Sequence, residues 1–88
     1  MGLKSKQELY EYLLTLSAKL TGRGAEKLGR AVITASRHAA GMSTEFLGES
    51  RIALREVAKD KSGILTHAEY TELSAVLKQI DSAFSDRR

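Results

Sequence analysis

Apolar residues recur at intervals of three and four in four successive stretches of this 88-residue chain. That interval places them along one face of an α-helix. The first stretch contains Leu9, Leu13, Leu16 and Leu20, and the last contains Tyr70, Leu73, Leu77, Ile80 and Phe84. No stretch alternates with the period of two that marks a half-buried strand, and the chain has no proline to interrupt a helix. An all-α fold is therefore expected.

Capping signals mark where these helices should begin and end. Two pairs fit the capping box Ser/Thr-x-x-Glu, namely Ser5 with Glu8 and Thr66 with Glu69. Ser43 is placed to cap another helix. Glycine is the usual residue at a helix end, and the expected stops are Gly22, Gly41 and Gly63.

The periodicity and the capping signals together predict helices over residues 6–20, 25–40, 44–59 and 67–84. Helices of this length joined by short loops favour a small antiparallel four-helix bundle, built as two packed helical hairpins. A chain of 88 residues fits a single domain spanning residues 1–88.

Composition excludes several classes of chemistry. The chain has no cysteine, which excludes disulfides, thiolate catalysis and zinc sites built on thiolates. No nucleophile–base set or glycine-rich phosphate loop is present, so the chain is expected not to be an enzyme and to need no cofactor or metal. It lacks a signal peptide and a run of about 20 apolar residues, which predicts a cytoplasmic protein that does not bind membranes.

A row of basic residues lies on the second predicted helix. Arg23, Lys27, Arg30 and Arg37 are spaced so that they share the side opposite the apolar stripe, and His38 lies beside them. Guanidinium groups pair with the phosphates of nucleic acid and with the carboxylates of proteins. These five residues are the candidate binding site for a protein or nucleic-acid partner. A solvated helix face explains the same row without any partner.

Three large apolar side chains fall outside the predicted core stripes, namely Tyr12, Ile33 and Ile52. If they cluster in space they would form a patch that needs a partner, and a second copy of the same chain would serve. A core wider than the stripes would also account for them.

The segment 39–47, Ala-Ala-Gly-Met-Ser-Thr-Glu-Phe-Leu, resembles the turn of a DNA-binding helix-turn-helix. The resemblance implies a DNA-binding regulator that uses the second and third helices. Arg37 and Ser50 stand where that family has buried small or apolar residues. Glu45 and Glu49 would face phosphates from the start of the recognition helix. A glycine that ends one helix, followed by a serine that caps the next, explains the same residues without DNA binding.

Residues 58–69 resemble a degenerate EF-hand calcium loop. Asp60, Ser62, Gly63 and Glu69 match the third, fifth, sixth and twelfth positions of that motif. The first position, ordinarily aspartate, is Ala58, so one carboxylate ligand is missing.

Taken together, the expected function is that of a small non-enzymatic helical module for protein–protein interaction or regulation, with self-association as one form of it. The alternative is a DNA-binding regulator, which the net charge of +3 permits and does not demand. Calcium binding ranks third.

Overall fold

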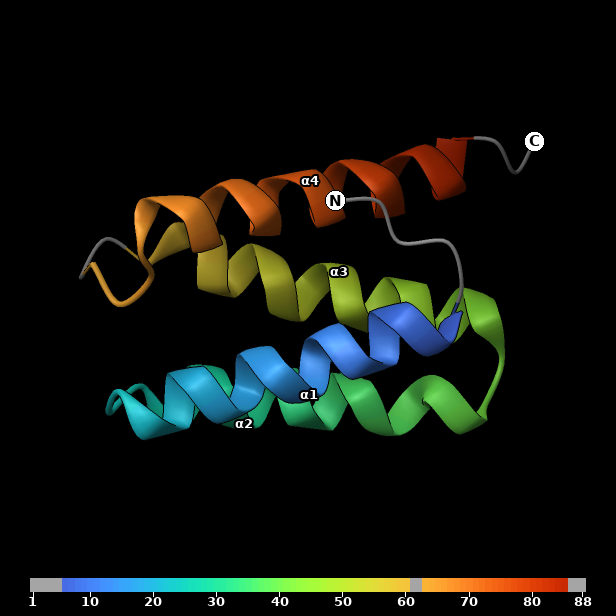
Figure 1. Cartoon of the computed structure of the whole chain (residues 1–88). Helices are drawn as coiled ribbons and strands as arrows, with labels where there is room; N and C mark the ends of the chain where they lie inside the picture. Colours follow the sequence, from blue (N-terminus) through green and yellow to red (C-terminus); the bar gives the residue numbers. More distant parts are fainter. Residues whose placement is uncertain (1–5, 61–62, 86–88) are drawn as a thin grey trace.

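In the computed structural model, which describes residues 6–60 and 63–85, four α-helices follow one another along the chain (Figure 1). They are α1 (Lys6–Gly22), α2 (Glu26–Ser36), α3 (Ser43–Lys59) and α4 (His67–Ser85), with a short 3-10 helix, η1 (Arg37–Ala40), after α2. Each helix packs on the next and runs back along it, so the described chain is an all-α bundle without strands (Figure 1). The predicted fold class is confirmed.

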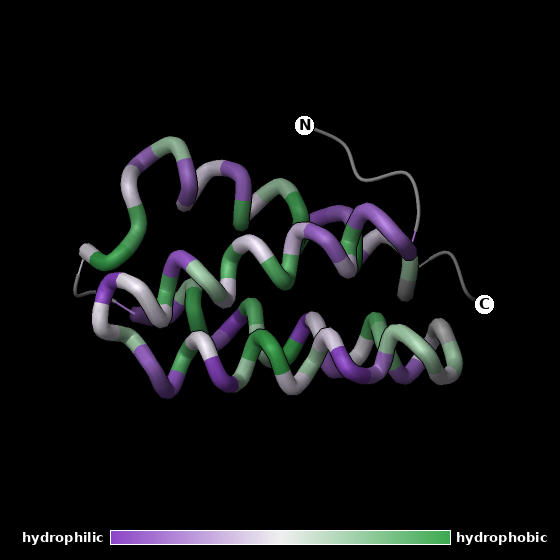
Figure 2. The backbone as a smooth tube through the Cα atoms, turned by 60° about the horizontal axis from the view of Figure 1, so that its bottom comes forward, coloured by the Kyte–Doolittle hydropathy of each residue, from purple (hydrophilic) through white to green (hydrophobic). Residues whose placement is uncertain are grey.

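One apolar core lies between the four helices, because each helix turns a stripe of aliphatic residues inward. Hydrophobic and hydrophilic segments accordingly alternate along every helix (Figure 2). The predicted leucine stripe of α1 is buried along its whole length. Among the largest fully buried side chains are Leu13, Leu20, Val32, Phe46, Leu54 and Leu73. Removing side chains of this size from water stabilises the fold by roughly 1.5–3 kcal/mol each.

The seam of α4 differs from the predicted one. Val76 is buried at 2% exposure, whereas Tyr70 is 39% exposed and its hydroxyl donates a hydrogen bond to the carbonyl of Ala58 at 2.8 Å. The side chain of Phe84 lies outside the described part of the structure. The face of α4 that enters the core is therefore turned toward Val76 and away from Tyr70.

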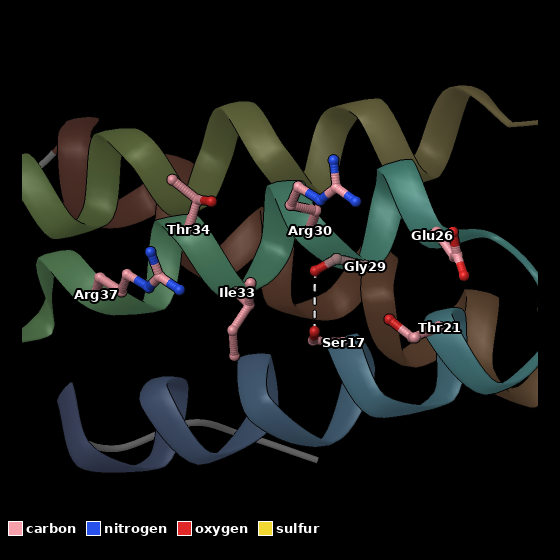
Figure 3. Close-up of a pocket in the computed structure, with 8 residues that line it drawn as sticks. All are labelled: Ser17, Thr21, Glu26, Gly29, Arg30, Ile33, Thr34 and Arg37. Atoms are coloured by element: carbon pink, nitrogen blue, oxygen red, sulfur yellow. Dashed lines mark hydrogen bonds between the residues drawn. The ribbon is translucent and has the colours of Figure 1, made fainter.

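Helices α1 and α2 approach most closely at Gly29. A Cβ atom built on this residue would collide with Thr21 Oγ1 and would lie 3.1 Å from the carbonyl oxygen of Ser17. The Ser17 hydroxyl donates a hydrogen bond to the Gly29 carbonyl at 2.9 Å (Figure 3). A glycine and a buried serine thus set the spacing of the first hairpin.

The turn after α1 is a Schellman motif centred two residues beyond the predicted stop. The helix continues through Gly22, and the residue with positive φ is Gly24, at +93°. The Ala25 amide donates to the Leu20 carbonyl at 2.8 Å, and the Gly24 amide donates to that of Thr21 at 3.1 Å. These are the two hydrogen bonds of the motif.

Of the three helix starts with expected caps, two lie within the described residues, and they differ from each other. Thr66 and Glu69 form the predicted capping box, with Thr66 N–H donating to Glu69 Oε1 at 2.9 Å and Glu69 N–H donating to Thr66 Oγ1 at 3.1 Å. At α3 the N-cap position belongs to Met42, because its carbonyl accepts the first helical bond and the helix begins at Ser43. The expected Ser43 cap is therefore wrong by one residue. Ser5 of the other predicted box lies outside the described residues.

The second helix is shorter than predicted as an α-helix. It ends at Ser36, and residues 37–40 continue as η1, with Gly41 closing the turn. The tighter 3-10 winding turns the chain toward α3 and places Arg37 beyond the end of the α-helix.

Candidate interaction surface

The five predicted basic residues do not form one continuous row. Lys27 and Arg30 are exposed on α2, and Arg37 is exposed on η1. Arg23 lies in the turn before α2, and His38 Nδ1 faces Glu45 Oε1 at 3.4 Å. The structure therefore separates Arg23 and His38, which face acidic groups, from the three remaining cations.

Arg23 is held by a carboxylate on α4. Its two terminal nitrogens donate to the two oxygens of Glu69 at 2.6 and 2.9 Å, and one of them also donates to the Ile64 carbonyl at 3.0 Å. Lys19 adds a further contact with Glu69 at 3.3 Å. The hydrogen bonds from Arg23 and from the Thr66 amide hold the pKa of Glu69 well below its usual range, and the same pair raises the pKa of Arg23. Arg23 thus joins two parts of the fold.

A groove runs between α2 and α3 and has a volume of about 420 Å³. We call it the α2–α3 groove, and it is lined by Lys27, Arg30, Ala31, Thr34, Ala35, Glu49, Ile52, Ala53 and Glu56. Its floor is formed by small and apolar side chains. Ile52 is 59% exposed there and, with Met42 and Tyr70, is one of the large apolar side chains exposed in the described chain.

The two walls of the α2–α3 groove carry opposite charges. The α2 wall presents Lys27 and Arg30, and the α3 wall presents Glu49 and Glu56. Within the described residues Lys27, Arg30 and Glu49 make no ion pair, while Glu56 contacts the exposed Lys59 at 3.4 Å. The groove therefore has a basic side and an acidic side with apolar atoms between them.

Two more grooves lie beside α1, and the first of them shares Arg30 and Thr34 with the α2–α3 groove. One, of about 510 Å³, lies between α1 and α2 and is lined in part by Ser17, Gly29, Ile33 and Arg37 (Figure 3). The other, of about 520 Å³, lies between the start of α1 and η1. Arg37 lines both, so the two grooves adjoin at its side chain.

The three spare apolar residues do not cluster. Tyr12 packs half-buried against the core, near Glu69 and Glu72 of α4, and its burial raises the pKa of its hydroxyl. Ile33 lines the groove between α1 and α2, and Ile52 lines the α2–α3 groove. The proposed single patch is thus divided among three surfaces, of which two are grooves.

The two motif-like segments have structural roles. Residues 37–42 form η1 and the turn from α2 to α3, and α3 then runs back alongside α2 as the second arm of a hairpin (Figure 1). In the loop that resembles an EF-hand, both carboxylate oxygens of Glu69 accept hydrogen bonds from Arg23. Ser62 of that motif lies outside the described residues. In the described ranges, no three His, Asp or Glu side chains lie where they could hold a metal ion together.

Sequence reasoning missed the acidic wall. Glu49, Ile52 and Glu56 are spaced by three and four residues, so the pattern that revealed the basic row of α2 also places these three on one face of α3. The acidic row of α3 could therefore have been predicted from the sequence. That it faces the basic row of α2 across a groove follows only from the packing of α2 on α3.

Comparisons with protein-family models, with curated proteins and with solved structures find no match to this chain. In the part of the chain that the structure describes, none of the helices combines the length and the apolar character needed to cross a membrane.

Proposed function

We propose that this chain is a non-enzymatic interaction module that pairs with a second copy of itself through the α2–α3 groove. The observation that carries the proposal is the division of that groove into a basic wall and an acidic wall on either side of the exposed Ile52. Such a surface is complementary to itself. Pairing would cover the most exposed isoleucine of the described chain and give Lys27, Arg30 and Glu49 partners of opposite charge.

The charge pattern selects one symmetry for the pair. A two-fold axis parallel to α2 and α3 brings the α2 wall of one copy over the α3 wall of the other, so that unlike charges meet. Because α2 and α3 run in opposite directions, Lys27 near the start of α2 is level with Glu56 near the end of α3. Each Lys27 would then face Glu56 of the second copy. A two-fold axis across the helices would place α2 on α2 and bring like charges together.

The apolar floor adds to the pairing. Ile52 of one copy would lie against the small side chains Ala31 and Ala35 of the other, which leave room for it. Exposed ion pairs contribute only about 0–1 kcal/mol each, so the charges select the orientation and the apolar contact supplies most of the affinity. A dimer that forms and dissociates with concentration is expected.

Charge reversal of one wall at a time tests this. The variant Lys27→Glu/Arg30→Glu has two acidic walls, and Glu49→Lys/Glu56→Lys has two basic walls. Each variant alone is expected to be monomeric in sedimentation velocity, where the wild type dimerises. An equimolar mixture of the two is expected to form a heterodimer, because every wall again meets its opposite.

Lys78→Glu is the matched control, since Lys78 is exposed on α4 away from the groove. It changes the net charge without changing either wall and should leave the dimer intact. A wild type that stays monomeric at millimolar concentration would exclude the proposal. So would wall variants that dimerise as well as the wild type does.

A further inference from the structure

A second surface, with a different charge pattern, lies between α1 and α2 and shares Arg30 and Thr34 with the α2–α3 groove. The groove between α1 and α2 and the groove between α1 and η1 meet at Arg37 and together follow the first hairpin from its turn to the start of α1. We call this combined surface the α1 crevice. Apolar and charged side chains follow one another along its length, and their order indicates what kind of partner the crevice fits.

Apolar atoms line the crevice on both sides of Arg37. Ile33 is half-buried and points from α2 toward α1 (Figure 3). Tyr10 is half-buried in the adjoining groove. Gly29 carries no side chain, and the Ser17 hydroxyl is already occupied by the Gly29 carbonyl. The lining thus offers apolar contact at two points, and it also includes exposed threonine hydroxyls.

The charge of the crevice changes from one end to the other. Glu26 lies at the end near the turn, whereas Arg30, Arg37 and Lys6 follow toward the other end. In the described part of the chain, neither Arg30 nor Arg37 makes an ion pair. Lys6 donates a hydrogen bond to the Gly41 carbonyl at 3.0 Å and lies 6.0 Å from the centre of the Phe46 ring. The two arginines are therefore the cations available to a partner.

Arg30 and Ile33 lie on α2, and Arg37 is the first residue of η1, which continues it. The three residues therefore follow one another at intervals of three and four, over about 10 Å along the axis. A second helix with an acidic residue, an apolar residue and an acidic residue at the same intervals would match all three. Its carboxylates would each meet a guanidinium, and its apolar residue would meet Ile33.

We infer that the α1 crevice binds an acidic amphipathic helix of a partner protein, with carboxylates seven residues apart on either side of a large aliphatic residue. A protein segment is favoured over nucleic acid because Glu26 would repel a phosphate backbone at one end of the crevice. The half-buried Ile33 and Tyr10 also suit an aliphatic side chain better than a sugar–phosphate chain. Arg30 lines both the crevice and the α2–α3 groove, whereas Ile33 and Arg37 do not line that groove, so the contacts of Ile33 and Arg37 with the partner helix do not depend on the dimer.

A fluorescent 15-residue stapled peptide with the pattern Glu-x-x-Leu-x-x-x-Glu serves as the probe, and anisotropy measures its affinity for the full chain. The same peptide with Gln in place of both Glu residues is the control ligand, and a 20-base-pair DNA duplex tests nucleic acid. The wild type is expected to bind the acidic peptide at least tenfold more tightly than the control peptide. Arg37→Glu is expected to weaken binding roughly tenfold, as the loss of a charge-assisted pair does.

Three further variants make the test specific. Ile33→Ser should weaken both peptides, because it removes the shared apolar contact. Lys78→Glu changes the net charge by the same two units as Arg37→Glu and should not change the affinity. Glu49→Lys/Glu56→Lys should lose the dimer and keep the peptide, which separates this inference from the proposed function. Equal weakening by Arg37→Glu and Lys78→Glu would overturn the inference, as would tighter binding of the duplex or no binding of either peptide.

Discussion

Arg23 and Glu69, 46 positions apart in the chain, are joined by two hydrogen bonds of 2.6 and 2.9 Å. The pair connects the turn between α1 and α2 to the first turn of α4. Helix α4 follows α3 in the packing order, so this contact ties the last helix to the first hairpin. Because Glu69 also accepts the Thr66 amide, one carboxylate both caps its own helix and holds it in place.

The Arg23–Glu69 pair should make stability depend on pH in the acid range. The folded protein holds the pKa of Glu69 below its usual value of about 4.3, so folding favours the ionised form. The stabilisation is fully present above that unfolded value and is lost as pH falls through the lower folded value. Urea unfolding at pH 7 and pH 3 should show a smaller loss of stability for Glu69→Gln than for the wild type.

Arg55→Ala is the control for this measurement. Arg55 contacts Asp81 at 3.5 Å, and both side chains are about half exposed, so their pairing should contribute little. Arg23→Ala should lower stability at pH 7 more than Arg55→Ala does. Equal effects of the two variants would show that the Arg23–Glu69 pair has no special role.

Calcium should not stabilise this protein. In the loop that resembles an EF-hand, Glu69 would have to supply a bidentate ligand, but its two oxygens already accept hydrogen bonds from Arg23. The first ligand position is Ala58. Thermal unfolding with and without millimolar calcium should give the same midpoint. A higher midpoint that disappears in Glu69→Gln would restore the calcium hypothesis.

The close approach of α1 and α2 makes Gly29 intolerant of a side chain. In Gly29→Ala the new methyl would meet Thr21 Oγ1 and the Ser17 carbonyl, so the hairpin must separate or bend. Overpacking of this kind costs typically 1–3 kcal/mol. Urea unfolding should show that loss, and Thr21→Ala in the same chain should recover part of it. An unchanged or increased stability of Gly29→Ala would mean that the two helices do not approach as described.

The spacing of apolar residues predicted the four helices, because a helix buries one face only if apolar residues recur every three or four positions. The predicted ends fall within two residues of the observed ones when η1 is counted with α2. The exceptions are local. Stop signals at Gly22 and Gly24 are indistinguishable in sequence, and only the hydrogen bonds of the Schellman motif identify Gly24. Val76 and Leu77 flank the line from Leu73 to Ile80 on either side, so a spacing of three and four residues fits both positions, and only the packing shows that Val76 is the buried one.

The surface was less predictable than the fold, because each of its features joins residues distant in sequence. The basic row of α2 could be predicted from the intervals between basic residues in the sequence. The pairing of Arg23 with Glu69 depends on the packing of α4, and spacing does not show that Arg30 and Arg37 make no ion pair within the described residues. The opposing rows of α2 and α3 likewise become two walls of one groove only when the helices are side by side.

Two buried serines should respond to alanine in opposite directions. Ser50 is fully buried and its hydroxyl has no hydrogen-bond partner among residues 6–60 and 63–85, whereas the Ser17 hydroxyl donates to the Gly29 carbonyl. Leaving a buried hydroxyl unpaired costs about 1–3 kcal/mol, so Ser50→Ala should stabilise the fold by about 1 kcal/mol. Ser17→Ala should destabilise it by a similar amount. Equilibrium unfolding of both variants tests this, and a loss of stability in Ser50→Ala would indicate a hidden partner for that hydroxyl.

Gly22 and Gly24, at the end of α1, should respond to alanine in opposite directions. Gly22 is within the helix, and a Cβ there would meet nothing within 4 Å. Gly22→Ala should therefore stabilise the protein by up to about 1 kcal/mol, the difference in helix propensity. Gly24 has φ of +93°, where an alanine is strained, and Gly24→Ala should destabilise the protein by roughly 1–2 kcal/mol. Thermal unfolding of the two variants side by side measures the difference. If both alanines had the same sign of effect, the helix would not end where the Schellman hydrogen bonds place it.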